Sequence, residues 1–291
     1  MRRVCLILNP NSGANRNRPR LRESLEQWAV DAGLDAEICP TVRVGHAREI
    51  AHEASKQFDC VVAVGGDGTV NEVACGAMES GVPVGIIPCG SGNGLARHLR
   101  IPMNPRAAMR VLASGQIRTI DTGTANGHRF VTAMGVGFDA EITRRFNEMP
   151  TRGLSSYVSI GTRLFFSYKP GHYTVSSGDR SVKLTPFLVS VANSDQLGNN
   201  ARIAPRARVD DGVLDLVALE PPGIFSSLGM AVRLFTGSLD RARGVTRMAG
   251  TRFEIRREGD GVIHVDGETR TAGPVIEVEV HPGSLRVIVP G

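Results

Sequence analysis

The sequence of 291 residues has no apolar run that approaches the ~20 residues needed to span a bilayer. The apolar run at residues 4–8 follows two arginines, but it is too short for the core of a signal peptide, and a turn-forming Asn-Pro pair follows it. With 41% hydrophobic and 22% charged residues, the composition excludes long disordered and fibrous classes. We expect two domains or one large domain.

Cysteine is scarce and poorly spaced for metal binding. The five cysteines lie in the first third of the chain, are odd in number and form no C-x-x-C pair, which argues against a disulfide scaffold or a zinc ribbon. The seven histidines are scattered singly, and none stands at a metal-ligand spacing. We therefore expect reduced, mostly buried thiols and a cytoplasmic location.

Lysine and aromatic residues are also rare. The chain has 3 lysines against 31 arginines, and 14 aromatic side chains. The net charge of +5 is diffuse, whereas a nucleic-acid-binding protein would show a basic stripe with stacking aromatics, so we expect no nucleic-acid partner. Arginine is the better bidentate partner for phosphate, but a GC-rich genome also favours arginine over lysine, and both explanations stay open.

The first part of the chain alternates strand-like and helix-like segments. The third apolar run has no polar alternation, which is typical of a parallel strand covered on both faces. The alternation of strands and helices predicts a doubly wound, parallel α/β domain. The predicted strands are residues 4–8, 36–39, 60–64 and 84–88, and the predicted helices are residues 19–32, 45–58, 70–79 and 91–99.

From about residue 121, short β-like runs recur between Gly, Asn and Asp turns. This spacing predicts a mainly antiparallel β-sandwich or barrel, interrupted by helices at about 154–166 and 224–234. Whether the last strand returns to the first domain stays open. The predicted strands are residues 129–133, 172–176, 187–193, 213–218, 252–256, 262–265, 275–281 and 285–289.

Three glycine-rich loops follow three apolar strands of the first domain. The carboxyl ends of parallel strands converge on one crevice, and glycines let the backbone approach a ligand closely. Because amides at such loops favour anions, three of them together predict a phosphate-rich ligand, although any single loop is also explained as a tight turn. The loops are Asn9-Pro10-Asn11-Ser12-Gly13, Gly65-Gly66-Asp67-Gly68-Thr69 and Gly90-Ser91-Gly92-Asn93-Gly94.

The same loops exclude several nucleotide-binding classes. The chain has no P-loop signature, no Gly-x-Gly-x-x-Gly after the first strand and no protein-kinase motif set. The carboxylate of Asp67 stands inside a predicted phosphate loop, where its charge is unfavourable. It needs compensation from Mg²⁺ or from neighbouring amides, although Asp is also a common turn former.

These residues resemble a known family. The segment at 64–72, Val-Gly-Gly-Asp-Gly-Thr-Val-Asn-Glu, resembles the nucleotide motif of the diacylglycerol kinase catalytic domain, which sphingosine kinases, ceramide kinases and bacterial soluble lipid kinases share. NAD kinases contain a shorter version of it. Further segments resemble the lipid kinases in family order, namely the opening loop at 9–13 and the segments at 88–97, 135–140, 203–215 and 266–268.

The resemblance implies an ATP-dependent kinase that phosphorylates a lipid hydroxyl. It implies a nucleotide-binding catalytic domain at residues 1–121, similar to phosphofructokinase and NAD kinase, and a β-rich lipid-binding domain at 122–291, with ATP in the cleft between them. The implied nucleotide-binding residues are Asn9, Asn11, Ser12, Gly13, Thr41, Gly65, Gly66, Asp67, Gly68, Thr69, Asn71, Glu72 and Ser91.

The resemblance also implies roles for acidic residues. Asp266 matches the proposed general base, with Asp67 and Glu268 as further catalytic residues. Arg208, Asp211 and Val213 match a structural Mg²⁺ site of backbone oxygens and one carboxylate, and oxygen-only ligation suits that ion. The Asp-Gly pairs at 211–212 and 266–267 are also typical hairpin turns.

The acceptor side is less defined. Asp139 and Glu141 match positions that meet the lipid head group, although an acid there also caps a helix start. The Gly-Ser-Gly-Asn-Gly form of the third loop is nearer to sphingosine kinases than to bacterial diacylglycerol kinases, so diacylglycerol, a sphingoid base and ceramide all remain candidate acceptors. The alternatives are an NAD kinase-like or other soluble polyol kinase, and a non-catalytic nucleotide sensor.

A kinase of this kind must reach a lipid in a bilayer. Two stretches, 154–168 and 228–257, combine apolar residues with arginines and predict salt-sensitive, peripheral binding to an anionic membrane surface at the inner face. A core helix and a solvated basic face explain them equally well. A homodimer also stays open.

Overall fold

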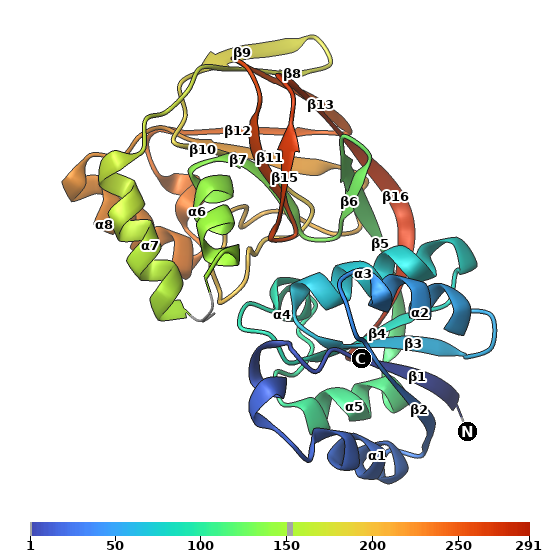
Figure 1. The fold of residues 1–291 in the computed structure, drawn as a ribbon. Helices are drawn as coiled ribbons and strands as arrows, with labels where there is room; N and C mark the ends of the chain where they lie inside the picture. Colours follow the sequence, from blue (N-terminus) through green and yellow to red (C-terminus); the bar gives the residue numbers. More distant parts are fainter. Residues whose placement is uncertain (1, 150–153) are drawn as a thin grey trace. The chain divides into compact units, whose positions relative to one another are not determined.

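The computed structural model describes residues 2–149 and 154–291 and divides into two compact units. Unit 1 consists of Met1–Ile120 and Gly283–Gly291, and unit 2 consists of Asp121–Pro282 (Figure 1). Unit 1 therefore takes its residues from both ends of the chain.

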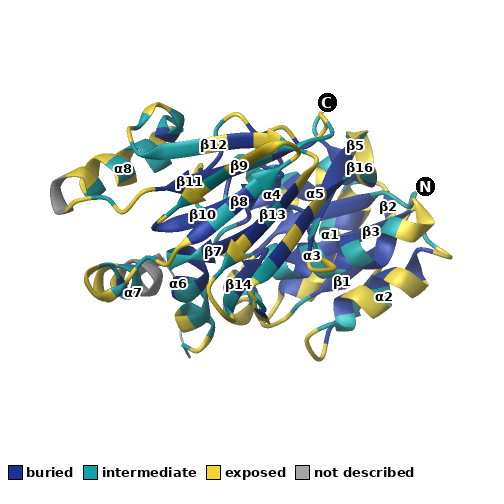
Figure 2. Cartoon of the chain, turned by 90° about the horizontal axis from the view of Figure 1, so that it is seen from above, coloured by how far each residue is buried: buried dark blue, intermediate teal, exposed yellow. Residues whose placement is uncertain are grey.

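Unit 1 contains a parallel sheet in the order β2-β1-β3-β4. Every residue of β3 and β4 is buried, as the uninterrupted apolar runs predict for strands covered on both faces. Figure 2 shows β3 in dark blue, whereas α2 (His46–Ala54) has exposed residues. The strands are β1 (Arg2–Leu8), β2 (Leu34–Pro40), β3 (Cys60–Gly65) and β4 (Val84–Pro88).

Helices cover both faces of this sheet. The first presents Leu21, Leu25 and Ala29 to the sheet at helical spacing. Helices α2 and α3 pack together on one face, and α1 and α5 on the other (Figure 1). The prediction of a doubly wound α/β domain is confirmed. The helices are α1 (Leu21–Asp31), α2 (His46–Ala54), α3 (Asp67–Ala77), α4 (Gly94–His98) and α5 (Pro105–Ser114), with short 3₁₀ turns η1 (Gly13–Asn17) and η2 (Met78–Ser80).

Unit 2 is built on an antiparallel sheet in the order β12-β11-β10-β7-β14-β15. A second antiparallel layer contains β16, β13, β8 and β9. Their strands are β7 (Ala133–Gly137), β8 (Tyr173–Ser177), β9 (Arg180–Leu184), β10 (Leu188–Ala192), β11 (Leu214–Leu219), β12 (Val245–Gly250), β13 (Arg252–Arg257), β14 (Gly261–Val265), β15 (Glu268–Ala272) and β16 (Val275–Val289).

One hydrophobic core lies between these two layers. It includes Met134 and Ile263 from the first sheet and Phe253 and Ile276 from the second, all fully buried. The predicted antiparallel β-sandwich is therefore confirmed. A second core packs the outer face of the six-stranded sheet against helical residues such as Phe138. The helices of unit 2 are α6 (Phe138–Asn147), α7 (Leu154–Ser167) and α8 (Ile224–Thr236), with a 3₁₀ turn η3 (Leu239–Arg241).

Three details differ from the sequence prediction. The runs at 275–281 and 285–289 form one strand, β16, which pairs with β13 near its start and places Val287 beside Val84 of β4. The predicted strand at 129–133 is instead divided between β6 (His128–Phe130) and β7. The sequence analysis did not predict several elements, namely β5 (Gln116–Ala125), β9, β12, β15, α5 and α6.

Candidate functional site

The three glycine-rich loops of unit 1 lie against one another at the carboxyl ends of β1, β3 and β4. A Cβ atom on Gly13 would lie 2.5 Å from the carbonyl oxygen of Cys89, and one on Gly90 would lie 2.5 Å from Cα of Gly66. A Cβ atom on Gly66 would in turn lie 3.2 Å from Oγ of Ser12. Because Cβ atoms essentially never approach within 3.0 Å of another heavy atom, only glycine fits at positions 13 and 90, where the loops present backbone rather than side chains.

Asp67 joins the second loop to the third. Its carboxylate accepts hydrogen bonds from the backbone amides of Asn93 (2.9 Å) and Gly94 (2.7 Å). Asn93 in turn closes its own loop, since its side chain both accepts from the amide of Gly90 and donates to the carbonyl of Gly90. Neighbouring amides are thus partners that compensate the charge of Asp67.

The first loop is tied to the second through Asn9. Its side-chain amide donates to Oγ1 of Thr69 (3.1 Å), and its Oδ1 accepts from the backbone of Asn11 (3.0 Å). A Cβ atom on Gly65 would overlap the Thr69 side chain. The loop side chains of Asn11 and Ser91 are exposed. The first loop therefore has a fixed inner half and an outer half that is open to a ligand.

Other predicted nucleotide residues surround these loops. The carboxylate of Glu72 accepts from the amides of Gly45 (2.9 Å) and Ala47 (3.0 Å), at the start of α2. Thr41 is buried, and its amide donates to the carbonyl of Leu8. Asn71 and Gly68 are half-buried on α3. In this structure Glu72 stabilises the N-terminus of α2, where a negative charge is favourable.

In unit 2, Asp266 lies in a two-residue turn between β14 and β15. Asp266 and Gly267 both have positive φ, at 47° and 81°, as a type I′ hairpin requires. The buried Asp266 carboxylate accepts from three consecutive backbone amides, those of Val131 (2.7 Å), Thr132 (2.9 Å) and Ala133 (3.1 Å). The hairpin interpretation of this pair therefore holds, and the same residue fixes the bend between β6 and β7.

Asn193 holds that bend from the other side. Its side-chain amide donates to the carbonyls of Asp121 (2.8 Å) and Val131 (2.9 Å), and its backbone amide donates to the carbonyl of Thr132 (2.9 Å). The sequence did not single out Asn193, because its partners lie far away in the chain.

Asp139 forms a buried pair with a residue that the sequence analysis missed. Its Oδ2 lies 3.1 Å from Nε2 of His264, and its Oδ1 accepts from the amide of Ala140 at the start of α6. Both side chains of the pair are buried, and a Cβ atom on Gly135 would overlap them. Side chains alternate along β14, so His264 points away from the core that contains Ile263 and Val265. This alternation was the one feature of the sequence that could have identified His264.

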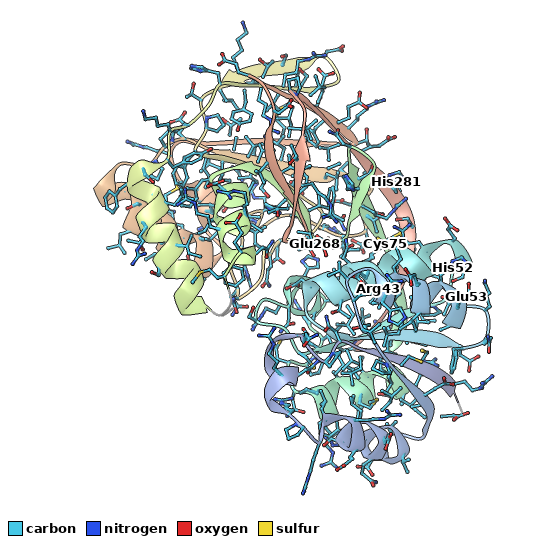
Figure 3. All side chains as sticks on the ribbon, viewed as in Figure 1. Arg43, His52, Glu53, Cys75, Glu268 and His281 are labelled. Atoms are coloured by element: carbon cyan, nitrogen blue, oxygen red, sulfur yellow. The ribbon has the colours of Figure 1, made fainter. Side chains whose placement is uncertain are left out.

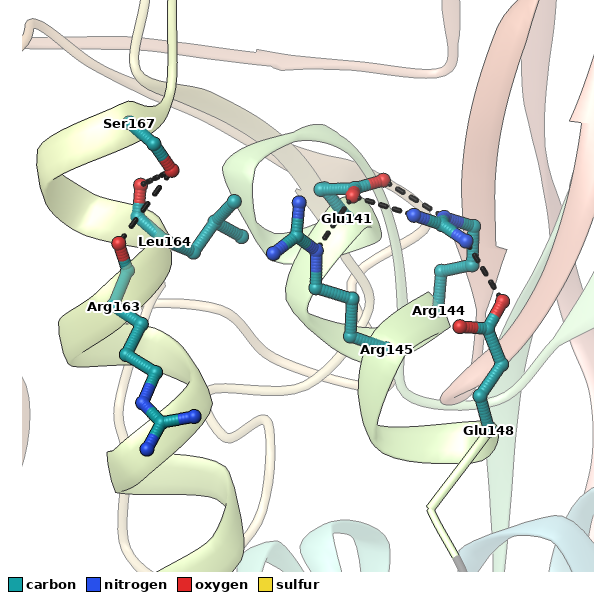
Figure 4. A network of polar contacts seen from close by, with 7 residues as sticks. All are labelled: Glu141, Arg144, Arg145, Glu148, Arg163, Leu164 and Ser167. Carbon is teal, nitrogen blue, oxygen red and sulfur yellow. Dashed lines mark hydrogen bonds and ion pairs between the residues drawn. The ribbon is translucent and has the colours of Figure 1, made fainter.

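The other two predicted acids of this region are paired with arginines. Glu141 on α6 binds Arg144 (2.7 Å) and Arg145 (2.8 Å), as Figure 4 shows. The hydrogen bond from Arg144 lowers the pKa of Glu141, with a further contribution from Arg145. Glu268, labelled in Figure 3, begins β15 and pairs with Arg270 (2.7 Å).

The predicted metal site lies in the turn before β11. Oδ1 of Asp211 accepts from the amide of Val213 (3.3 Å), and the amide of Gly212 donates to Asp121 (2.7 Å). Burial, followed by the charge of Asp211, raises the pKa of Asp215. Across residues 2–149 and 154–291, no group of three or more His, Cys, Asp or Glu side chains could hold a metal ion. The predicted ligands are chiefly backbone oxygens, with Asp211 as the carboxylate, and oxygen-only ligation of this kind suits Mg²⁺.

Two domain-family models match the chain. The diacylglycerol kinase catalytic domain matches residues 3–125, and the YegS C-terminal NAD kinase beta sandwich-like domain matches residues 132–289. The chain belongs to the diacylglycerol kinase family of lipid kinases. The resemblance found in the sequence, and with it the lipid kinase class, is confirmed.

Curated relatives agree with this assignment. A relative from Chromohalobacter salexigens, named "probable lipid kinase YegS-like", is 34% identical over 73% of this chain and 69% of its own length. A diacylglycerol kinase of Bacillus subtilis is 28% identical over 92% of this chain and 90% of its own length.

Solved structures show the same fold. A diacylglycerol kinase of Bacillus anthracis superposes with a TM-score of 0.76 at 22% identity, covering 99% of this chain and 97% of that one. An NAD kinase of Archaeoglobus fulgidus, solved in complex with ATP, superposes with a TM-score of 0.53 at 11% identity, covering 98% and 93%. The family thus shares its architecture with the NAD kinases.

Proposed function

We propose that the protein transfers the γ-phosphoryl group of ATP to the hydroxyl of a membrane lipid, either diacylglycerol or a sphingoid base or ceramide. The observation that carries this proposal is the contact of three glycine-rich loops at one edge of the parallel sheet of unit 1. Backbone amides and glycine surfaces exposed in this way suit a polyphosphate, since they admit close approach and offer hydrogen-bond donors. Membership of the lipid kinase family supports the choice of acceptor.

In this proposal the loop residues bind ATP, which enters with Mg²⁺ as the substrate. The outer residues Asn11, Ser12 and Ser91 would contact phosphates, while Asp67 and Asn9 keep the loops in register through their hydrogen bonds. Phosphoryl transfer requires alignment and charge neutralisation more than covalent chemistry. The work of unit 1 is therefore positional, and Asp67 acts by holding two loops together.

Asp266 is the proposed general base. A lipid alcohol does not ionise at neutral pH, so a carboxylate within hydrogen-bond reach would accept its proton as the phosphoryl group transfers. The three amides at Asp266 fix the orientation of its carboxylate.

Asp139 and Asp266 would together define the part of the site that binds the lipid acceptor. Asp139 follows β7, and Asp266 binds the residues that precede β7, so one short strand positions both carboxylates. We propose that Asp139 contributes to recognition of the lipid head group, with Glu141 nearby on α6, and that Glu268 orients the turn. The turn containing Arg208, Asp211 and Val213 would hold a structural Mg²⁺, whose chemistry is to cross-link oxygen ligands.

Exposed apolar residues on α8 support peripheral membrane binding. Leu228, Val232 and Phe235 recur at helical spacing and are 73%, 54% and 52% exposed. The exposed residues Arg241 and Arg243 follow this helix. Their side chains make no hydrogen bond or ion pair with any described residue, so they offer charge to anionic lipids. Among the described residues, no helix is both long and apolar enough to cross a bilayer.

The stretch at 154–168, which was also predicted to bind the membrane, has less support. On α7, Phe166 is 70% exposed, and the side chains at 154–158 lie outside those that the structure describes. We propose that α8 contacts the membrane at the cytoplasmic face of the inner membrane. The alternative is that the same apolar face joins two copies of the protein in a homodimer, and vesicle flotation distinguishes the two.

A radiolabel transfer assay tests the proposed reaction. The protein is incubated with Mg²⁺ and γ-labelled ATP, with diacylglycerol, sphingosine, ceramide or NAD as acceptor. Label in a lipid supports the proposal and identifies the acceptor. Label in NAD alone would show that the protein is an NAD kinase, and transfer to none of the four would contradict the proposal.

A further inference from the structure

The bend between β6 and β7, at residues 131–133, is held by two residues from distant parts of the chain. Its three backbone amides donate to the carboxylate of Asp266. The carbonyls of Val131 and Thr132 accept from the side chain and the backbone amide of Asn193, both at 2.9 Å. The carbonyl of Ala133 accepts from the backbone amide of Asp266, also at 2.9 Å. Asp266 and Asn193 together therefore pair all six backbone groups of the bend.

The side chain of Asn193 ties this bend to two neighbouring strands. Asn193 directly follows β10, and its side-chain amide donates to the carbonyl of Asp121 on β5 (2.8 Å) as well as to that of Val131. The residue is 1% exposed. A side chain buried to this extent does not touch a substrate, so any effect that it has on a reaction passes through the bend.

The position uses Asn193 as a donor alone. Its Oδ1 is buried and accepts no hydrogen bond from the described part of the chain. The opposite orientation of the amide would place this oxygen against the two carbonyl oxygens, which cannot donate, so Nδ2 must face them. An unpaired buried oxygen is costly. The two donated hydrogen bonds are thus the contribution of this side chain, and they are made at the expense of its own acceptor.

Asn193 is more firmly anchored than Asp266. Asn193 follows a strand that is paired with β7 on one side and with β11 on the other. Asp266 instead lies in the turn between β14 and β15, with a positive φ of 47°. The amides at 131–133 fix the orientation of the Asp266 carboxylate, so the place of that carboxylate depends on where Asn193 holds the bend.

We propose that Asn193 is a positioning residue for phosphoryl transfer, which places the bend so that its amides direct the Asp266 carboxylate toward the acceptor hydroxyl. The inference rests on the proposed function of Asp266 as the general base. Asn193 supplies no reacting group, and its effect is on alignment. Catalysis is sensitive to alignment, since a displacement of about 1 Å can lower a rate about 10²-fold.

A double-mutant cycle tests the proposal. Transfer of label from ATP to the preferred lipid is measured for Asn193→Ala, for Asp266→Asn and for the double variant. Asn193→Ala removes both side-chain donors and keeps the backbone amide. We expect a loss of about 10- to 100-fold in kcat with an unchanged KM for ATP. Added to Asp266→Asn, the same substitution should cause no further loss of kcat, because the carboxylate that Asn193 positions is then absent.

Ser190→Ala is the matched control. Ser190 is fully buried on β10, and its hydroxyl donates to the carbonyl of Met134 on β7 (3.3 Å), beyond the bend. This variant should keep a near-normal kcat. Thermal denaturation identifies the variants that fold. Asn193→Ser, which keeps one shorter donor, is the milder variant, and its loss of kcat should lie between those of Asn193→Ala and Ser190→Ala.

The cycle separates positioning from a purely structural role. An equal loss of kcat on adding Asn193→Ala to the wild type and to Asp266→Asn would overturn the inference, as would lower melting temperatures of folded Asn193 variants with an unchanged kcat. Near-normal kcat for Asp266→Asn alone would overturn the general-base role itself, and this inference with it. That result comes from a different arm of the experiment, so the two failures are distinguishable.

Discussion

The carboxylate of Asp139 lies 3.1 Å from Nε2 of His264, and both side chains are buried beneath the start of α6. The opposite ring nitrogen of His264, Nδ1, is also buried and has no partner in the described part of the chain. The space for this pair exists because residue 135, on the neighbouring strand, is glycine.

Gly135→Ala should therefore destabilise unit 2. The new methyl group would overlap the Asp139 carboxylate and the His264 ring, and overpacking of this kind typically costs about 1–3 kcal/mol. Thermal denaturation measures the effect. The matched control is Gly229→Ala on α8, where a Cβ atom meets nothing within 4 Å, and this variant should be neutral or slightly more stable. Equal melting temperatures for the two variants would show that the pair tolerates displacement.

Asp67→Ala should abolish phosphoryl transfer and lower the stability of unit 1. The variant leaves the amides of Asn93 and Gly94 without their acceptor, and each unsatisfied group costs about 1–3 kcal/mol if it stays buried. Steady-state kinetics and thermal denaturation measure the two effects. Asp59→Ala is the control, because Asp59 also accepts a backbone amide, that of Arg3, but at an exposed position. Normal turnover by folded Asp67→Ala would contradict the assignment of these loops to ATP.

Glu141→Gln should reduce stability in a pH-dependent way. Arg144 lowers the pKa of Glu141, so the ionised pair stabilises the protein above the ordinary glutamate pKa of about 4.3. That stabilisation, roughly 0.5–1 kcal/mol for a pair of this exposure, is lost as the pH falls through the lowered pKa. Urea denaturation should separate the variant from the wild type at neutral pH but not in strong acid. Glu148→Gln, which removes a more exposed partner of Arg144, should show a smaller difference.

Leu228→Glu combined with Phe235→Glu should weaken binding to anionic vesicles. Both side chains are more than half exposed, so the substitutions should leave the fold unchanged while removing apolar contact with the bilayer. Vesicle flotation at low and high salt measures the effect. Val30→Glu with Val44→Glu, two exposed apolar residues of unit 1, is the control. If the α8 variant still floats but changes from a dimer to a monomer, the face is an interface between copies of the protein.

The sequence predicted the parts of this fold that local patterns encode. Uninterrupted apolar runs identified β3 and β4, and the glycines after them marked the ligand loops. The bend at Val131 could not be found in this way, because Asp266, 135 residues later, binds its amide. The capping of α2 by Glu72 is also non-local, since Glu72 lies 27 residues from Gly45.

His264 illustrates a second limit. A single histidine in a short strand has no local signal beyond alternation, and its partner Asp139 lies 125 residues earlier. The division of one predicted strand into β6 and β7 has the same origin, since the carboxylate of Asp266 binds the backbone amides at the bend. Tertiary hydrogen bonds decide where a strand bends, whereas composition decides only that strands are present.

The most direct test of the account compares Asp266→Asn with Gly267→Ala in the transfer of label from ATP to the preferred lipid. Both substitutions should destabilise the turn, since asparagine cannot accept all three amides and alanine is strained at a φ of 81°. Only Asp266→Asn removes the proton acceptor. We expect a loss of about 10²–10⁴-fold in kcat for Asp266→Asn and near-normal kcat for folded Gly267→Ala. Equal loss in both variants, or near-normal kcat in Asp266→Asn, would contradict it.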